Sequence, residues 1–179
     1  MKITLVRHGQ TEENFKGLIQ GRSNNLLNDT GRRQCKYLRN KLLDKNFDYC
    51  YMSPLVRCVE TAFILVGDRV PTIRDDRLIE RDMGELEGRP WEEYNAYKYW
   101  DYELNCGDRG IERVKEIFER CRDFLNYIDN KYDDNASILI VTHGAPYRAL
   151  RYLIKGKKIS GHLLDGKIDN CMYEEFEYK

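Results

Sequence analysis

Apolar runs and amphipathic segments alternate along the chain and predict strands separated by helices. Ile3–Val6 and the stretch SILIVT at 137–142 have the continuous apolar character of buried strands, in which β-branched threonines are tolerated. FDYCYMS at 47–53 is the next strand candidate, and a short strand is expected around residues 72–73. The tail NCMYEEFEY at 170–178 is only weakly strand-like.

Four segments have the spacing of amphipathic helices. Apolar residues recur every three or four positions in 27–43 and in 111–128, while 54–66 and 143–154 each carry a proline near their start. Asn28 or Thr30 can cap the first of these helices. Residues 78–110 are the least regular part, although WEEYNAYKYW at 91–100 is predicted to be a helical stretch dense in aromatic side chains.

Strands that alternate with helices favour an α/β fold, in which a mostly parallel central sheet is covered on both faces in a three-layer α/β/α sandwich. A length of 179 residues suits one domain that spans 1–179. Because ligands of such sheets bind at the carboxyl ends of the strands, the residues that follow each strand are the first candidates for a site.

Charge and hydropathy narrow the class of partner. Basic and acidic residues balance at 30 each, which lacks the positive excess of a nucleic-acid binder. No apolar stretch is long enough to cross a bilayer, and the first residues become charged too soon for a secretory signal. We therefore expect a cytoplasmic protein without nucleic-acid or membrane partners. The sequence leaves open whether it is a monomer or a dimer.

Cysteine spacing indicates reduced thiols. Six cysteines are scattered without a CxxC pair, so a zinc site built on sulfur is not expected. Cys35 and Cys121 fall on the apolar faces of predicted helices, where a free thiol behaves as a small hydrophobe.

Two predicted strands end in histidine, in the stretches ITLVRHG and LIVTHG. If these strands are neighbours, His8 and His143 meet at one edge of the sheet, although 135 residues separate them (143 − 8). Arg7 and Arg57 would face the same crevice, and their guanidinium groups match phosphate oxygens.

The surroundings of the histidines favour an anion. Gly9 and Gly144 allow the backbone to approach a ligand closely, and the helix after His143 offers free N–H groups. A metal site is the alternative for paired histidines, but an arginine beside each candidate ligand would repel a divalent cation. The sequence thus predicts an anion pocket with two imidazoles and no metal.

A neutral histidine can attack phosphorus, provided that its second ring nitrogen is held by an acceptor such as a carbonyl in the His8–Gly9 turn. The leaving alkoxide then needs a proton, which arginine cannot supply at neutral pH. The segment RLIERDMGELEGRP offers four carboxyl groups for this role. They are Glu80, Asp82, Glu85 and Glu87, and spacing alone does not choose among them.

Five stretches, in order, resemble the motifs of the histidine phosphatase superfamily, also called the phosphoglycerate mutase-like family. They are LVRHGQTEEN, QGRSNNLLNDTGRRQ, SPLVRCVETA, LIERDMGELEG and VTHG. RHG alone is weak, but five ordered blocks between residue 3 and about residue 150 form a specific pattern. The resemblance implies a phosphoglycerate mutase-like fold.

The resemblance also assigns roles by position. It implies that His8 accepts the phosphoryl group, that Glu80 donates the proton, and that no metal or other cofactor is needed. The implied contacts to the phosphoryl group and the pocket lining are Arg7, Asn14, Gln20, Gly21, Arg57, His143 and Gly144. One stretch departs from the family pattern, because NCGDRGIERV replaces a Gly-Glu-Ser motif and leaves only Asp108 as a candidate for its glutamate.

Each assignment has a plainer alternative. Arg57 could pair with Glu60, Glu80 could be a surface charge, and Asn14 and Gln20 could only cap turns. The aromatic stretch at 91–100 fits packing better than a lid over the substrate. His162 is expected in an exposed loop.

Three functions remain open. They are a phosphatase that acts on a small phosphorylated metabolite, a phosphoglycerate-type mutase, and a phospholigand-binding domain without catalysis. Mutases of this family carry a longer insertion before the second histidine, whereas Glu80 and His143 are only 63 residues apart (143 − 80), which favours the phosphatase. Candidate substrates are phosphorylated sugars, sugar acids, α-ribazole phosphate and phosphoserine. Arg22, Arg81 and Tyr94 are candidates for recognising the rest of the substrate.

Overall fold

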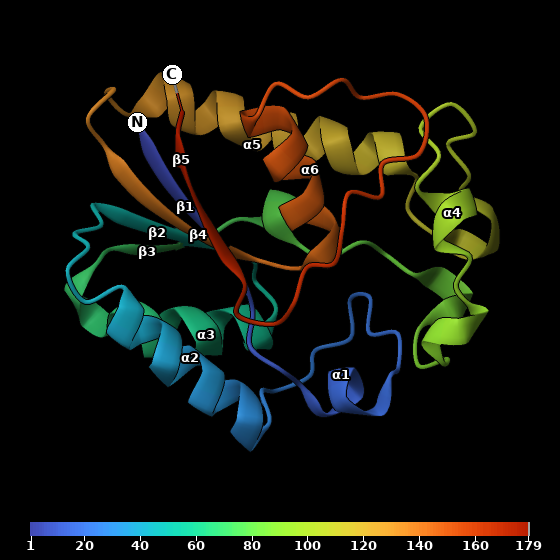
Figure 1. Cartoon of the computed structure of the whole chain (residues 1–179), viewed down its shortest axis with the longest axis horizontal. Coiled ribbons are helices and arrows are strands. Elements are labelled where there is room, and N and C mark those ends of the chain that lie inside the picture. The colour runs from blue at the N-terminus through green and yellow to red at the C-terminus, as the bar shows by residue number, and fades with distance from the viewer. Residues whose placement is uncertain (179) are drawn as a thin grey trace.

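The computed structural model describes residues 1–178, and within them five strands form one sheet in the order β3-β2-β4-β1-β5. The strands are β1 (Lys2–Arg7), β2 (Tyr49–Met52), β3 (Thr72–Arg74), β4 (Ser137–Thr142) and β5 (Tyr173–Glu177). Neighbouring strands run parallel except at one edge, where β5 lies antiparallel to β1. This antiparallel pairing places the two ends of the chain side by side (Figure 1).

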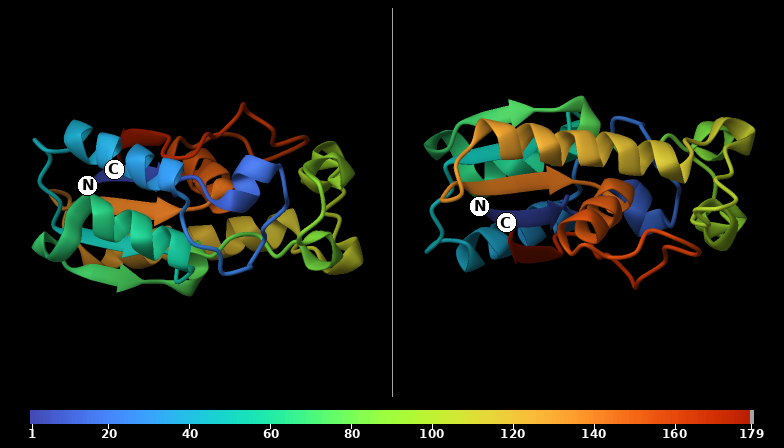
Figure 2. Two further views of the ribbon diagram at one scale, coloured as in Figure 1. Left: turned by 90° about the horizontal axis from the view of Figure 1, so that it is seen from below. Right: turned by 90° about the horizontal axis from the view of Figure 1, so that it is seen from above.

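Helices cover both faces of the sheet. The helices are α1 (Glu12–Lys16), α2 (Asp29–Lys41), α3 (Val56–Val66), α4 (Ala96–Tyr99), α5 (Val114–Lys131) and α6 (Gly144–Ile154). Helices α2 and α3 lie against one face, and α5 and α6 lie against the other (Figure 2). Single turns of 3-10 helix occupy Gly67–Arg69, Asp76–Leu78, Gly84–Leu86, Trp91–Glu93 and Asp108–Gly110. The predicted three-layer α/β/α sandwich, of the phosphoglycerate mutase-like type, is confirmed.

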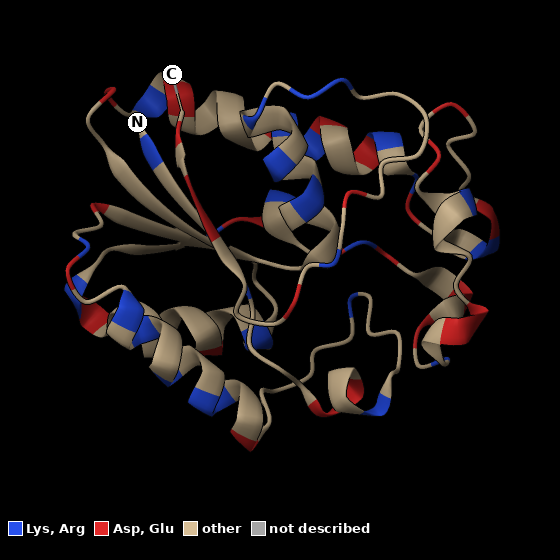
Figure 3. Cartoon of the chain, in the orientation of Figure 1, with Lys and Arg blue, Asp and Glu red and all other residues tan. Residues whose placement is uncertain are grey.

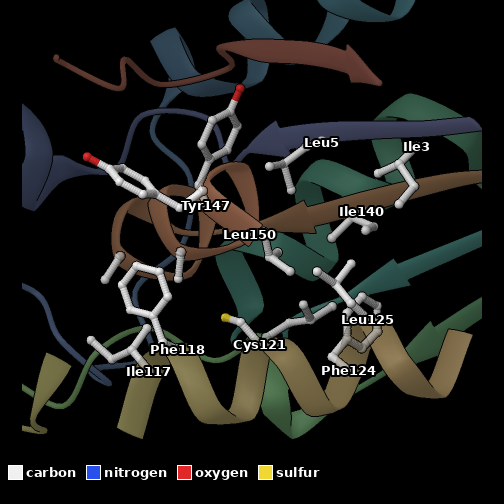
Figure 4. Close-up of a cluster of buried hydrophobic side chains, with 14 of the residues drawn as sticks. Ile3, Leu5, Ile117, Phe118, Cys121, Phe124, Leu125, Ile140, Tyr147 and Leu150 are labelled. Atoms are coloured by element: carbon white, nitrogen blue, oxygen red, sulfur yellow. The ribbon is translucent and has the colours of Figure 1, made fainter. Parts of the chain in front are cut away.

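The period-2 alternation along β4 builds the two cores. Ile138 and Ile140 pack with α5 and α6, whereas Leu139 and Val141 point to the opposite face and pack with α2 and α3. Figure 4 shows the first of these clusters, in which Phe118 of α5 lies toward α6 and Phe124 lies beneath the strands. A strand buried on both faces reads as a continuous apolar run, which is why this stretch was predictable.

Most of the predicted elements are present, with shifts of a few residues at their ends. Asn28 is the cap of α2, because its side chain accepts a hydrogen bond from the N–H of Gly31 at 2.8 Å. The helix predicted at 111–128 begins at Val114, after an extended Arg113. Helix α1 was not predicted, and the helix expected over 91–100 is reduced to single turns.

Charged residues lie on the helices and loops, at the ends of strands and along the edge strand β5, so the central strands β1, β2 and β4 are free of them between their ends (Figure 3). Within residues 1–178, no helix combines the length and apolar character needed to span a bilayer. The six cysteines, all among these residues, are free thiols, and Cys35 and Cys121 are buried as expected.

The segment between β3 and α5 lies beyond the carboxyl ends of the strands and carries α4 (Figure 1). Arg81, which is only 1% exposed, joins the parts of this segment through its hydrogen bonds. The guanidinium donates to the carbonyl of Glu112, the hydroxyl of Tyr94 and the carbonyl of Tyr99, at 2.8, 3.0 and 3.0 Å. This buried cation therefore fixes the segment that faces the strand ends.

Two glycines allow α2 to approach the loop after β1. A Cβ atom on Gly31 would lie 2.1 Å from the carbonyl oxygen of Gln10, and one on Gly9 would lie 2.8 Å from the carbonyl oxygen of Gly31. The loop that carries His8 is thus pressed directly against the first turn of the helix.

We predict that Gly31→Ala destabilises the protein by about 2 kcal/mol or more, because the methyl group would collide with backbone. Helix propensity alone predicts the opposite, a gain of about 1 kcal/mol. Urea unfolding of the variant and of the wild type decides between them. Lys36→Ala, at an exposed position of the same helix, should change the free energy of unfolding by less than about 0.5 kcal/mol. A stabilised Gly31→Ala variant would show that the loop does not press on the helix.

Candidate active site

The pairing of β1 with β4 brings the two predicted histidines together. Arg7 is the register partner of Thr142, so the residues that follow them, His8 and His143, leave the sheet side by side. The N–H of His8 donates to the carbonyl of Thr142 at 3.0 Å. The two ring centroids are 5.1 Å apart, with the ring planes inclined at 62°.

A backbone carbonyl fixes the tautomer of His8. Its Nδ1 lies 2.7 Å from the carbonyl oxygen of Gly9. A carbonyl can only accept, so Nδ1 carries the proton and Nε2 keeps its lone pair. Within the described residues, no hydrogen bond engages Nε2, and the side chain lines a cavity. His8 thus lines the cavity with a ring that keeps one unprotonated nitrogen without a hydrogen bond to the described residues.

His143 lies behind this cavity rather than on its wall. Its Nδ1 accepts a hydrogen bond from Nε of Arg57 at 3.1 Å, so Nε2 carries the proton and donates to the hydroxyl of Ser53 at 2.7 Å. Ser53 was not singled out from the sequence, although it begins the block SPLVRCVETA. Both ring nitrogens of His143 are therefore engaged by protein groups.

Both imidazoles are held uncharged. Burial lowers the pKa of His8 well below its ordinary value of 6.5, and the positive charges of Arg57 and Arg7 lower it further. Burial also lowers the pKa of His143, again aided by Arg57. The hydrogen bond to Gly9 acts in the opposite direction on His8 but is the smaller influence.

Arg57 is committed to neutral acceptors. Besides His143, it donates to the carbonyl oxygens of Ser23 and Gly21, at 2.6 and 2.8 Å. It does not pair with Glu60, whose carboxylate accepts from Arg32 at 2.6 Å. The positive charge of Arg57 therefore faces the cavity without a carboxylate to neutralise it.

Arg7 has a donor without a partner. One terminal nitrogen of its guanidinium donates to the carbonyl of Ile168. Its Nε is buried and, within the described residues, makes no hydrogen bond. An unpaired buried donor of a charged group costs free energy unless a ligand supplies the acceptor. Arg7 lines the same cavity as His8, so an anion placed there would satisfy it.

The polar residues of the first loop also line the cavity. The side-chain oxygen of Asn14 accepts from Asn170 at 3.1 Å, and that of Gln20 accepts from Thr11 at 2.9 Å. Because the amide oxygens are occupied, the –NH2 groups of Asn14 and Gln20 are the parts left to contact a ligand. Gly21 lies beside them and offers its carbonyl to Arg57, as described above.

Glu80 is the only one of the four candidate carboxyl groups that lines the cavity. Its Oε1 accepts the N–H groups of Arg81 and Ala145 at 2.9 and 3.0 Å, and its Oε2 accepts that of Gly144 at 3.0 Å. The carboxylate thus occupies the amino terminus of α6, which favours a negative group.

The other three carboxylates face elsewhere. Asp82 pairs with Arg22 at 3.4 Å, and Glu87 accepts the N–H of Arg22 at 2.6 Å. Glu85, with a largely exposed side chain, lies 3.8 Å from Arg109. Position thus separates Glu80 from its neighbours, which spacing could not do.

The cavity has a volume of about 230 Å³, and much of its wall is apolar. Trp91, Tyr94 and Trp100 line it, so the aromatic stretch does more than pack internally. The sequence named Tyr94 as a candidate for substrate recognition but favoured packing for the stretch as a whole, because spacing does not show which aromatic side chains face a cavity.

Three further expectations concern residues outside the cavity. Asp108 forms an ion pair with Lys98 at 2.6 Å and does not line the cavity, so it does not replace the missing family glutamate there. His162 is exposed as predicted, between α6 and β5, and its ring stacks on Tyr97 with centroids 3.4 Å apart. Arg22 is also absent from the cavity wall.

Comparison with known proteins agrees with this geometry. Residues 3–179 match the family described as histidine phosphatase superfamily (branch 1). The chain is 30% identical over 180 residues to phosphoserine phosphatase 1 of Hydrogenobacter thermophilus, covering 97% of this chain and 84% of the relative. It is 31% identical over 159 residues to a 2,3-bisphosphoglycerate-dependent phosphoglycerate mutase of Cytophaga hutchinsonii, covering 83% and 74%.

A solved structure shows the same arrangement of the chain. A mutant phosphoserine phosphatase of Entamoeba histolytica in complex with phosphoserine superimposes with a TM-score of 0.82 at 26% identity, covering 97% of this chain and 89% of that chain. With a family match over nearly its whole length, relatives at 30% identity or more and a common fold, the chain belongs to the histidine phosphatase superfamily.

Proposed function

We propose that this protein is a metal-independent phosphatase that hydrolyses a small phosphomonoester through a phosphohistidine on His8. The observation that carries the proposal is the unprotonated Nε2 of His8, which faces a cavity beside two arginines with no carboxylate partner. A neutral nucleophile among positive charges suits attack on a phosphate dianion.

The first half-reaction transfers the phosphoryl group to the protein. The lone pair of Nε2 forms a bond to phosphorus while the bond from phosphorus to the ester oxygen breaks, and the hydrogen bond from Nδ1 to the Gly9 carbonyl stabilises the charge gained by the ring. Arg7 and Arg57 hold the equatorial oxygens, and the –NH2 groups of Asn14 and Gln20 add further donors. His143 acts through Arg57, whose guanidinium it orients.

Glu80 supplies the proton that the departing oxygen needs. Its Oε1 accepts two backbone N–H groups and its Oε2 accepts only one, so Oε2 is the oxygen with room for a proton. In the second half-reaction the resulting carboxylate takes a proton from water as the water oxygen attacks phosphorus, and the bond from phosphorus to Nε2 breaks and returns its electron pair to the ring of His8. The products are free phosphate, the alcohol and the original protein.

Hydrolysis is preferred over phosphoryl return to a second oxygen of the same substrate. Relatives of this chain include enzymes named as phosphatases and enzymes named as mutases. A mutase has to exclude water from its phosphoenzyme, which requires a closed site. Purified protein that isomerises phosphoglycerates faster than it releases phosphate would establish the mutase instead.

We predict that His8→Asn lowers phosphate release by at least about 1000-fold, because no other group on the cavity wall is placed to attack. Rapid acid-free quenching and mass spectrometry should detect a phosphorylated His8 peptide in the wild type and none in the variant. His162→Asn is the matched control, since this histidine lies outside the cavity. Full turnover by His8→Asn would eliminate the proposed intermediate.

The loss of activity caused by removing the acid of Glu80 should depend on the leaving group of the ester. We expect Glu80→Gln to lower kcat/KM for ethyl phosphate by about 100-fold or more, and for phenyl phosphate by much less, because phenoxide departs readily without a proton. Glu85→Gln, in the same loop but away from the cavity, should leave both esters unaffected. Equal slowing of the two esters by Glu80→Gln would rule out its role as proton donor.

The depressed pKa of each buried histidine predicts a stability that falls on mild acidification. Below pH 6.5 the unfolded chain binds protons on these two side chains while the folded protein does not. Proton binding therefore stabilises the unfolded state relative to the folded state. From pH 7 to 5.5 this effect lowers the free energy of unfolding by about 1 kcal/mol for each histidine. Urea unfolding at both pH values measures it, and His143→Gln should remove about half. A stability that rises on acidification would show that the rings are charged.

A further inference from the structure

The outer wall of the cavity, beyond the groups proposed to hold phosphate, is apolar. We define it by Ile19, Met83, Trp91, Trp100, Leu164 and Ile168. From this wall we infer that the site takes monoesters of apolar, ring-bearing alcohols and discriminates against those that carry a carboxylate. The inference rests on the proposed phosphatase function and concerns the part of the substrate that leaves with the ester oxygen.

Recognition of a carboxylate needs a cation whose N–H groups point at the ligand, and three of the five N–H donors of Arg81 point at protein oxygens instead. Arg81 lines the cavity, but its side chain is 1% exposed, and each of its three nitrogens donates to a protein oxygen. Its guanidinium also lies over the ring of Trp100, 5.4 Å from the centroid. A group fixed on all sides in this way cannot turn toward a ligand without giving up buried hydrogen bonds.

Arg148 is likewise committed. Its terminal nitrogens donate to the carboxylate of Asp165 at 2.6 Å and to the carbonyl of Gly166 at 2.8 Å. Its guanidinium covers Trp100, with the carbon 5.2 Å from the ring centroid. Asp165 also accepts from Arg151 and Lys157, so it screens the charge of Arg148 without cancelling it. Arg148 is kept from a ligand by the engagement of its terminal nitrogens and by its contact with the aromatic ring.

Lys167 is the remaining cation among the described residues that line the outer part of the cavity. Its ammonium group pairs with Asp169 at 2.7 Å, and the two side chains are 84% and 67% exposed. An exposed, screened lysine that already has an acidic partner adds little to ligand affinity. The outer wall therefore lacks a strong carboxylate receptor.

The aromatic side chains form a surface suited to a ring. Trp91 is 44% exposed and meets Tyr94 edge to face at 5.3 Å, and Tyr94 in turn stacks on Tyr99 at 5.3 Å with planes inclined by only 6°. The hydroxyl of Tyr94 accepts from Arg81, which fixes the stack in place. Rigid aromatic faces bind apolar and planar groups at little entropic cost, whereas a polyhydroxy sugar would leave its hydroxyl groups without partners.

The test compares esters whose leaving groups are all simple alkoxides: 2-phenylethyl phosphate, ethyl phosphate, phosphoserine and 3-phosphoglycerate. We expect kcat/KM for 2-phenylethyl phosphate to exceed that for phosphoserine and 3-phosphoglycerate by at least about tenfold. Trp91→Ala should lower kcat/KM for 2-phenylethyl phosphate by about tenfold and change that for ethyl phosphate less than twofold. Tyr97→Ala, in the same segment but outside the cavity, is the matched control and should change neither.

A second variant tests the missing cation directly and does not depend on removing an aromatic ring. Leu164→Arg places a guanidinium without an acidic partner on the outer wall and should raise the ratio of kcat/KM for phosphoserine to that for 2-phenylethyl phosphate about tenfold. Leu104→Arg, at an exposed position away from the cavity, should leave the ratio unchanged. Lys167→Met should have no effect on either ester beyond twofold.

The outcomes separate this inference from the proposed function. Hydrolysis of phosphoserine or 3-phosphoglycerate at least as fast as 2-phenylethyl phosphate would overturn the inference and leave the phosphatase intact. An unchanged profile in Trp91→Ala would do the same. Failure to hydrolyse any ester, ethyl phosphate included, would overturn the phosphatase and the inference with it.

Discussion

The parallel pairing of β1 with β4 is the constraint on which the site depends. In this register Arg7 lies opposite Thr142, so His8 and His143 leave the sheet side by side. A register shift of one residue would turn one of the two histidines to the other face of the sheet. The backbone beyond the pair is fixed as well, because the N–H of His8 bonds to Thr142 and Gly9 is pressed against α2. The position of the His8 ring is thus set by buried backbone hydrogen bonds and by packing against α2.

The arginines around the site divide according to what accepts their hydrogen bonds. Arg57 donates to two carbonyl oxygens and an uncharged imidazole, so it is well ordered and retains its full charge. Arg148 donates to the carboxylate of Asp165, which also pairs with Arg151 and Lys157, so its charge is screened only in part. Neutral acceptors thus leave the charge of Arg57 uncompensated beside His8, whereas a carboxylate screens that of Arg148 on the outer wall.

The sequence was most informative where local pattern and position decide the structure. The sheet was predictable from buried apolar runs such as 137–142. Most of the site was predictable from the glycine beside each histidine and from the five ordered motifs that resemble the family. The sequence was least informative where contacts join distant loops. The hydrogen bonds of His143 with Ser53 and of Arg7 with the Ile168 carbonyl join residues far apart in the sequence, so residue spacing does not reveal them. Helix α1 has only five residues, too few to show a helical period. The choice of Glu80 among four carboxyl groups came from resemblance, and only geometry gives a physical reason for it, namely its position at the amino terminus of α6.

The fold separates the two tasks that a phosphatase has to perform. Groups proposed for the chemistry sit at strand ends and helix termini, where strand pairing and hydrogen bonds such as that from Arg57 to His143 fix their positions. Groups proposed to choose the alcohol sit on the segment between β3 and α5, on the loop after α6 and, with Ile19, after α1. Arg81 fixes the first of these segments through Glu112, Tyr94 and Tyr99, none of which belongs to the sheet. Substitutions on the outer wall can therefore change which ester fits without moving His8. For that reason a name shared with relatives says more about the reaction of this chain than about its substrate.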